Sequence, residues 1–159
     1  MQLYSQYCDG MYIVAKRFVK DADDAEDVVQ ECFIKAFEKI YQLENEANLG
    51  GWIKRIVVNK SLDVARNKNK IQFTTDTTFL ENEPLEEDFI EQHISIDFIK
   101  ECINKLKEKY RVILVLYMIE DYNHREIGEL LKINESTVRN QYRRGKNQLL
   151  QLLKVKQTG

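Results

Sequence analysis

Residues 122–146 read YNHREIGELLKINESTVRNQYRRGK, and their pattern is the most informative in the chain about its architecture. Ile127, Leu130 and Leu131 fall at helical spacing, which predicts a short helix with one apolar face. A longer helix follows, and the residues of its predicted buried stripe are Val138, Tyr142, Gly145 and Leu149. Two such helices joined by a tight turn predict a helix-turn-helix, whose second helix enters the major groove of DNA.

The turn between these two helices carries one favourable and one unfavourable residue. Gly128 is small at the point where the second helix has to approach closely. Such a turn favours a glycine with positive φ, but Lys132 occupies that place, so we expect backbone strain or a different turn. Asn134 or Ser136 can cap the helix that follows.

The exposed side of the longer helix is predicted to be basic. Residues 135–159 hold six Lys and Arg residues against one acid, in a chain of formal net charge −2. Cationic side chains neutralise phosphates, Arg can bind guanine through two hydrogen bonds, and Asn can do the same with adenine. The alternative is that these charges only keep an ordinary helix of an all-α core in solution.

Composition favours an all-α protein with one ordinary domain or two small ones. The 159 residues include one Pro and six Gly, so helix breakers are scarce. The three cysteines, Cys8, Cys32 and Cys102, are widely spaced among apolar residues, which indicates buried thiols; no metal site and no cofactor is expected. No apolar run approaches about 20 residues and the N-terminus has no leader, so we expect a cytoplasmic protein without membrane insertion.

Charge divides the chain into three parts. Residues 52–70 carry six basic residues against one acid, whereas residues 71–92 carry seven acids and no Lys or Arg. The latter segment lacks helical periodicity and contains the only proline, which predicts a flexible acidic linker. The predicted domains are therefore 1–70 and 93–159, with the linker at 71–92 between them.

Apolar periodicity places the remaining helices. The predicted ranges are 3–19, from Asp23 or Asp24 to Tyr41, 52–66, about 94–106 and 110–120. Residues 42–51 are predicted to form a polar loop ahead of Trp52.

Several motifs in this order resemble the sigma-70 family of bacterial RNA polymerase sigma factors, in its small extracytoplasmic-function (ECF) group. The motifs are DAEDVVQECF at 24–33, WIKRIVVN at 52–59 with Asp63 and Arg66, YRVILVL at 110–116, Glu126-Ile127, and TVR at 137–139 with Arg144. The chain departs from the family at Lys107, where proline is common, and at Lys132. The resemblance implies a factor without catalysis that binds core RNA polymerase and directs promoter-specific initiation. It also implies promoter DNA and an anti-sigma factor as partners.

The resemblance assigns three sets of contact residues by position. The polymerase-binding residues are Asp27, Gln30, Glu31 and Phe33. The residues at the minus-10 element are Trp52, Lys54, Arg55, Asn59 and Lys60. The residues at the minus-35 element are Thr137, Arg139, Asn140, Arg143, Arg144 and Lys146. Trp52 has the alternative of being a core residue, since large aromatic side chains usually bury most of their surface.

Two other functions compete with this interpretation. A stand-alone helix-turn-helix regulator that binds duplex DNA as a dimer explains residues 122–146, but not the first domain or the acidic linker. A nucleic-acid enzyme finds no support, because the sequence offers no paired metal-binding carboxylates, phosphate-binding Gly loop or nucleophile–base pattern.

Overall fold

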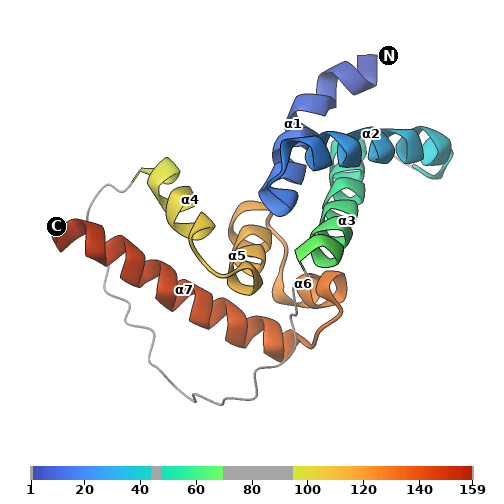
Figure 1. Cartoon of the computed structure of the whole chain (residues 1–159). Coiled ribbons are helices and arrows are strands. Elements are labelled where there is room, and N and C mark those ends of the chain that lie inside the picture. Colours follow the sequence, from blue (N-terminus) through green and yellow to red (C-terminus); the bar gives the residue numbers. More distant parts are fainter. Residues whose placement is uncertain (1, 44–47, 70–94, 159) are drawn as a thin grey trace. The chain divides into compact units, whose positions relative to one another are not determined.

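The computed structural model describes residues 2–43, 48–69 and 95–158, and every regular element in these ranges is a helix (Figure 1). The all-α prediction is therefore confirmed. The chain divides into two compact units, unit 1 (residues 1–71) and unit 2 (residues 72–159). The predicted acidic linker, 71–92, lies outside the described residues.

Unit 1 is a bundle of three helices. They are α1 (Gln2–Val19), α2 (Ala22–Lys39) and α3 (Leu49–Asn69), with a short 3-10 helix, η1 (Ile40–Gln42), after α2. Each of the three long helices packs against the other two. The fully buried side chains between them include Phe18, Phe33, Ile53, Val57 and Leu62. A helix whose apolar stripe faces two neighbours buries it on both, which stabilises the bundle.

Two helix starts in unit 1 differ from the prediction. Lys20 ends α1 with a φ of 61°, which places Asp21 in an extended conformation. Asp21, rather than Asp23 or Asp24, therefore caps α2, and its Oδ1 accepts a hydrogen bond from the Asp24 N–H at 3.0 Å. The third helix begins at Leu49 rather than Trp52. Gly50 in its first turn lets this helix pack closely on α1, since a Cβ there would lie 3.2 Å from the Tyr7 ring.

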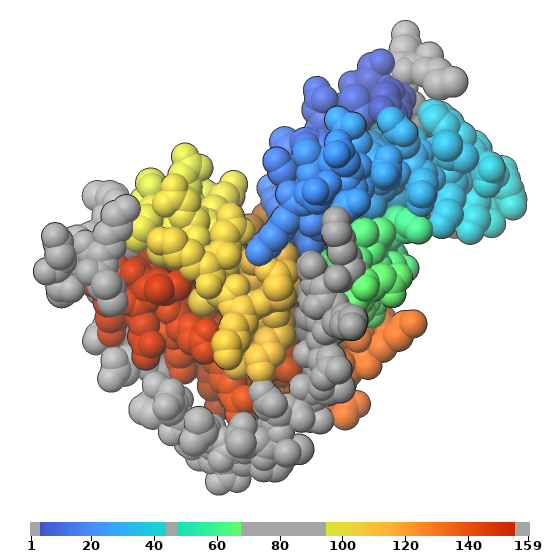
Figure 2. All heavy atoms as spheres, viewed as in Figure 1, coloured from blue at the N-terminus to red at the C-terminus, as the bar shows by residue number. Residues whose placement is uncertain are grey.

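Unit 2 is built around one long helix. Its elements are α4 (Ile96–Asn104), α5 (Glu108–Leu114), the π-helix η3 (Val115–Ile119), α6 (His124–Leu131) and α7 (Glu135–Thr158). The long α7 packs against α4, α5 and α6, and the first two lie against it in the space-filling view (Figure 2). The predicted helix 110–120 begins two residues earlier, and it changes to π-helical geometry at Val115.

The α5–α7 crossing depends on a glycine. A Cβ on Gly145 would lie 3.1 Å from the Tyr110 Cβ and 3.4 Å from the Leu114 Cδ1. The predicted stripe of α7 is confirmed, since Val138, Gly145 and Leu149 are buried and Tyr142 is half-buried. This packing fixes which face of α7 is left to solvent.

Candidate nucleic-acid interface

The helix-turn-helix begins with a capping box on α6. The Asn123 Oδ1 accepts a hydrogen bond from the Glu126 N–H at 2.8 Å, and the Asn123 N–H donates to the Glu126 Oε1 at 3.2 Å. Two N–H groups that the first turn would otherwise leave without partners are thus bonded. Asn123 and Glu126 together therefore define where α6 begins.

The turn between α6 and α7 combines strain with close approach. Lys132 has φ 59° and ψ 43°, the left-handed conformation that the sequence predicts to be strained for a residue other than glycine. The Ile133 N–H returns to the Gly128 carbonyl at 3.0 Å, and a Cβ on Gly128 would lie 2.8 Å from the Ile133 oxygen. Gly128 is thus the residue that lets the turn fold against α6.

Three aromatic rings hold the start of α6 and the middle of α7 against η3. The Tyr117 and His124 rings stack with centroids 4.6 Å apart, and the Tyr142 ring lies 4.6 Å from Tyr117 and 5.1 Å from His124. Burial, and secondarily the charge of Arg139, lowers the pKa of His124 from its ordinary 6.5. Burial therefore favours the neutral form of this imidazole in the folded chain.

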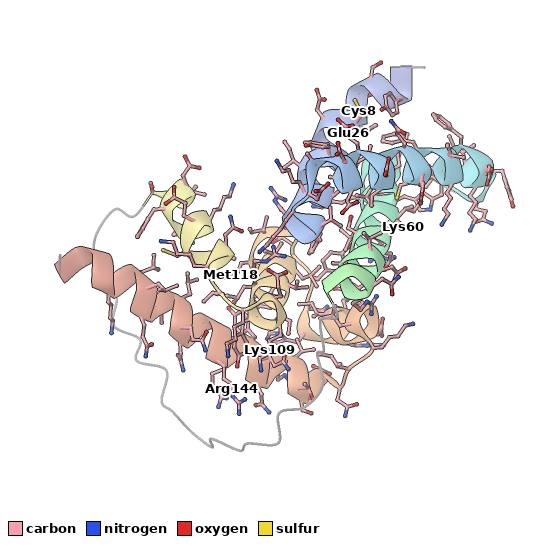
Figure 3. All side chains as sticks on the ribbon, viewed as in Figure 1. Cys8, Glu26, Lys60, Lys109, Met118 and Arg144 are labelled. Carbon is pink, nitrogen blue, oxygen red and sulfur yellow. The ribbon has the colours of Figure 1, made fainter. Side chains whose placement is uncertain are left out.

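The face of α7 away from this packing carries all but one of the predicted minus-35 residues, and the Arg144 side chain projects from the helix in Figure 3. Arg139, Asn140 and Arg143 are exposed, and Arg144 and Lys146 are half-buried. Thr137 differs from the rest, because it is only 7% exposed and packs within unit 2. The five accessible side chains can offer guanidinium, ammonium and amide donors to phosphates and base edges.

One acid accompanies these cations, and it is Glu135, the single acidic residue of the stretch 135–159. The Glu135 Oε1 accepts a hydrogen bond from the Arg139 Nη2 at 2.6 Å within the first turns of α7. A Glu four residues ahead of an Arg on a helix is a favourable ion-pair spacing, so the sequence alone indicates that Glu135 and Arg139 can pair.

In unit 1 the predicted polymerase-binding residues divide by burial. Asp27, Gln30 and Glu31 are exposed on α2, whereas Phe33 is only 2% exposed. The Phe33 ring lies edge-on to Tyr4, with centroids 5.0 Å apart, so this side chain belongs to the core beneath the surface.

The predicted minus-10 residues all lie on α3. Arg55 and Asn59 are exposed, and Trp52, Lys54 and Lys60 are half-buried, so Trp52 is neither a fully buried core residue nor a free surface ring. The Lys60 side chain projects from α3 (Figure 3), and its Nζ lies 3.2 Å from the Glu31 Oε2 on α2. One predicted DNA contact thus pairs with one predicted polymerase contact, which sequence spacing could not show.

The cysteines carry no disulfide. Cys32 and Cys102 are buried as predicted, while Cys8 is half-exposed, which corrects the expectation for that residue. Burial raises the pKa of the Cys32 thiol to about 11, so it stays protonated and unreactive near neutral pH. Within the described ranges, no helix has the length and apolar character that crossing a membrane requires, and no group of three His, Cys, Asp or Glu side chains could hold a metal ion.

Comparison with known proteins identifies the family to which this chain belongs. Residues 3–71 match the family described as Sigma-70 region 2, and residues 99–149 match Sigma-70, region 4. The RNA polymerase sigma factor SigV of Bacillus subtilis is 32% identical over 146 residues, which cover 90% of this chain and 84% of SigV. The chain belongs to the ECF group of the sigma-70 family.

Other proteins similar to this sigma factor support the same family assignment. The ECF RNA polymerase sigma factor SigW of Bacillus subtilis is 29% identical, over 93% of this chain and 85% of SigW. The ECF sigma factor SigE of Mycolicibacterium smegmatis is 30% identical over 93% of this chain, which spans 59% of the length of SigE. The sigma factor RpoE of Bartonella quintana, solved with the anti-sigma factor NepR, shares the fold, with TM-score 0.59 and 22% identity over 97% of this chain and 96% of RpoE.

Proposed function

We propose that this sigma factor binds core RNA polymerase and directs promoter-specific transcription initiation. In this proposal α7 reads the minus-35 element, and α3 contacts the minus-10 element. The protein performs no catalysis, acts in the cytoplasm and is held inactive by an anti-sigma factor, the kind of partner present in the RpoE structure.

The exposed face of α7 is the observation that carries the proposal. Its buried stripe packs on α5 and α6, so Arg139, Asn140 and Arg143 project together from the second helix of a helix-turn-helix. This is the position from which such a helix reaches base edges. A stand-alone regulator gains no support from unit 1, which matches a sigma-70 region of its own.

The single most informative experiment is run-off transcription with core polymerase on a pool of promoters. Wild-type protein should direct initiation at a subset that shares a minus-35 sequence. Arg143→Ala should weaken selection by about 1–3 kcal/mol at one base pair if it reads that base. An equal loss on every promoter would instead identify a phosphate contact, and no loss would remove Arg143 from the interface.

The proposed polymerase-binding surface of α2 is best tested with a variant that keeps the Glu31–Lys60 ion pair. Changing Glu31 would also affect Lys60 on α3, the helix proposed to contact DNA. Asp27→Lys combined with Gln30→Ala meets this condition, since both residues are exposed on α2. Co-purification with core polymerase should fall while helicity is kept. Glu101→Lys, an exposed charge change on α4, is the control and should leave co-purification unchanged.

A further inference from the structure

An acid stands at the head of the row of cations on α7. Glu135 is the first residue of the helix, and its spacing places it in one row with Arg139 and Arg143. Its Oε1 is 2.6 Å from the Arg139 Nη2, and the two side chains are 44% and 63% exposed. The pair therefore lies on the solvent side of the helix that presents the predicted DNA contacts.

The stability that the Glu135–Arg139 pair contributes is too small to explain why an acid stands among these cations. An exposed ion pair of this kind stabilises a protein by only about 0–1 kcal/mol. A carboxylate at this end of the helix also repels the DNA phosphates that the neighbouring cations attract. A favourable interaction with the helix macrodipole exists, but aspartate supplies it equally well.

The hydrogen-bonding capacity of the pair suggests another use. An ionised carboxylate only accepts hydrogen bonds, and Oε1 already accepts one from Arg139. The other oxygen can accept from an amino group in the major groove, and cytosine N4 is the partner that acidic side chains take there. The same hydrogen bond favours one orientation of the Arg139 guanidinium, and its remaining donors suit the O6 and N7 of guanine.

We propose that Glu135 is a specificity-determining residue of this sigma factor, which positions Arg139 for guanine and itself accepts a hydrogen bond from a cytosine of the minus-35 element. The inference rests on the proposed function, because it requires α7 to lie in the major groove of that element. It adds a negative residue to a surface otherwise identified by its cations.

The test is competitive binding of the polymerase holoenzyme to promoters randomised across the minus-35 element. Glu135→Asp keeps the charge and the helix-start preference but shortens the side chain, so discrimination at the cytosine should fall about ten-fold. Glu135→Gln should shift the preference at that position from cytosine toward adenine, since an amide can both donate to N7 and accept from N6.

Glu129→Gln is the matched control. Glu129 lies in the same helix-turn-helix, pairs with Arg125 at the same four-residue spacing at 3.5 Å, and is exposed. Removing its charge should leave the base preference unchanged. If Glu135→Gln changes the affinity equally for all sequences and leaves the base preference unchanged, the acid acts only through its charge and the inference is overturned.

Arg139→Ala separates this inference from the proposed function. If it relaxes the base preference while both Glu135 variants keep the wild-type preference, α7 reads the element without Glu135 and only the inference fails. If neither Arg139→Ala nor Arg143→Ala alters minus-35 selection, α7 does not read the element and the proposed function fails with it.

Discussion

Each unit contains an ion pair of the same spacing and length, but the two differ in burial. In unit 1 the Arg66 Nη2 lies 2.8 Å from the Asp63 Oδ1, and in unit 2 the Arg111 Nη2 lies 2.7 Å from the Glu108 Oε2, both at i,i+3. The Arg66 side chain is 23% exposed, whereas Arg111 is 1% exposed and its Nε also bonds the Glu108 Oε1 at 2.8 Å.

Burial, rather than distance, sets what these two pairs contribute. An exposed pair exchanges water for a partner at little net gain, because water screens both charges. A buried guanidinium has lost its water, so taking away this carboxylate removes stabilisation that water cannot replace. Unit 1 thus keeps this pair at the surface, while unit 2 depends on one inside its core.

The largest expected effect comes from breaking these pairs one at a time. Glu108→Ala should destabilise unit 2 by about 3 kcal/mol, because the buried Arg111 charge loses its bidentate acceptor. Asp63→Ala should cost unit 1 no more than about 1 kcal/mol. Urea unfolding of the full chain, followed by hydrogen exchange of each unit, measures both. Equal losses in the two units would refute the role assigned to burial.

A second, smaller effect compares two helical glycines. Gly128→Ala should destabilise unit 2 by about 1–3 kcal/mol, because the new Cβ meets the Ile133 backbone oxygen at 2.8 Å and the turn has to shift. Gly10→Ala in α1 meets nothing within 4 Å and should stabilise unit 1 by about 0.5–1 kcal/mol. Thermal unfolding of each variant shows whether the substitution lowers or raises the stability of its unit. If Gly128→Ala instead stabilises unit 2, the α6–α7 turn lies farther from Gly128 than the 2.8 Å contact indicates.

The smallest expected effect is a pH dependence confined to unit 2. The pKa of His124 is lowered in the folded chain by burial and by Arg139, so the unfolded chain takes up the proton first as the pH falls. Its contribution to stability is present above about pH 6.5 and is lost as the pH falls through the lower, folded pKa. Residues 1–71 contain no histidine.

His124→Phe provides the measurement, since it keeps a ring against Tyr117 and removes the titration. The free energy of unfolding of unit 2 should then vary less between pH 7.5 and 5.5 than in the wild type. His93→Gln is the control for the other histidine of the chain. An unchanged pH dependence in the His124 variant would show that other groups cause it.

The helical class, the helix-turn-helix and the basic face of α7 could all be predicted from the amino-acid pattern. Periodicity sufficed for these because a buried stripe at i, i+4, i+7 and i+11 leaves the opposite face to solvent, and the cations of α7 lie there. Gly128 and Lys132 were also interpretable, since close approach and positive φ are local requirements of a tight turn. The family resemblance supplied the promoter and polymerase roles, which neither spacing nor charge contains.

Contacts between elements and the burial of individual side chains could not be predicted from that pattern and required the folded structure. Asp21 rather than Asp23 or Asp24 became the cap because Lys20 adopts a positive φ, and Thr137 and Phe33 are buried although their motifs suggested surface contacts. The Glu31–Lys60 contact joins residues 29 positions apart, which periodicity along one helix cannot connect. Burial depends on what covers a side chain, and that is fixed by the neighbouring helices rather than by the residue's own sequence.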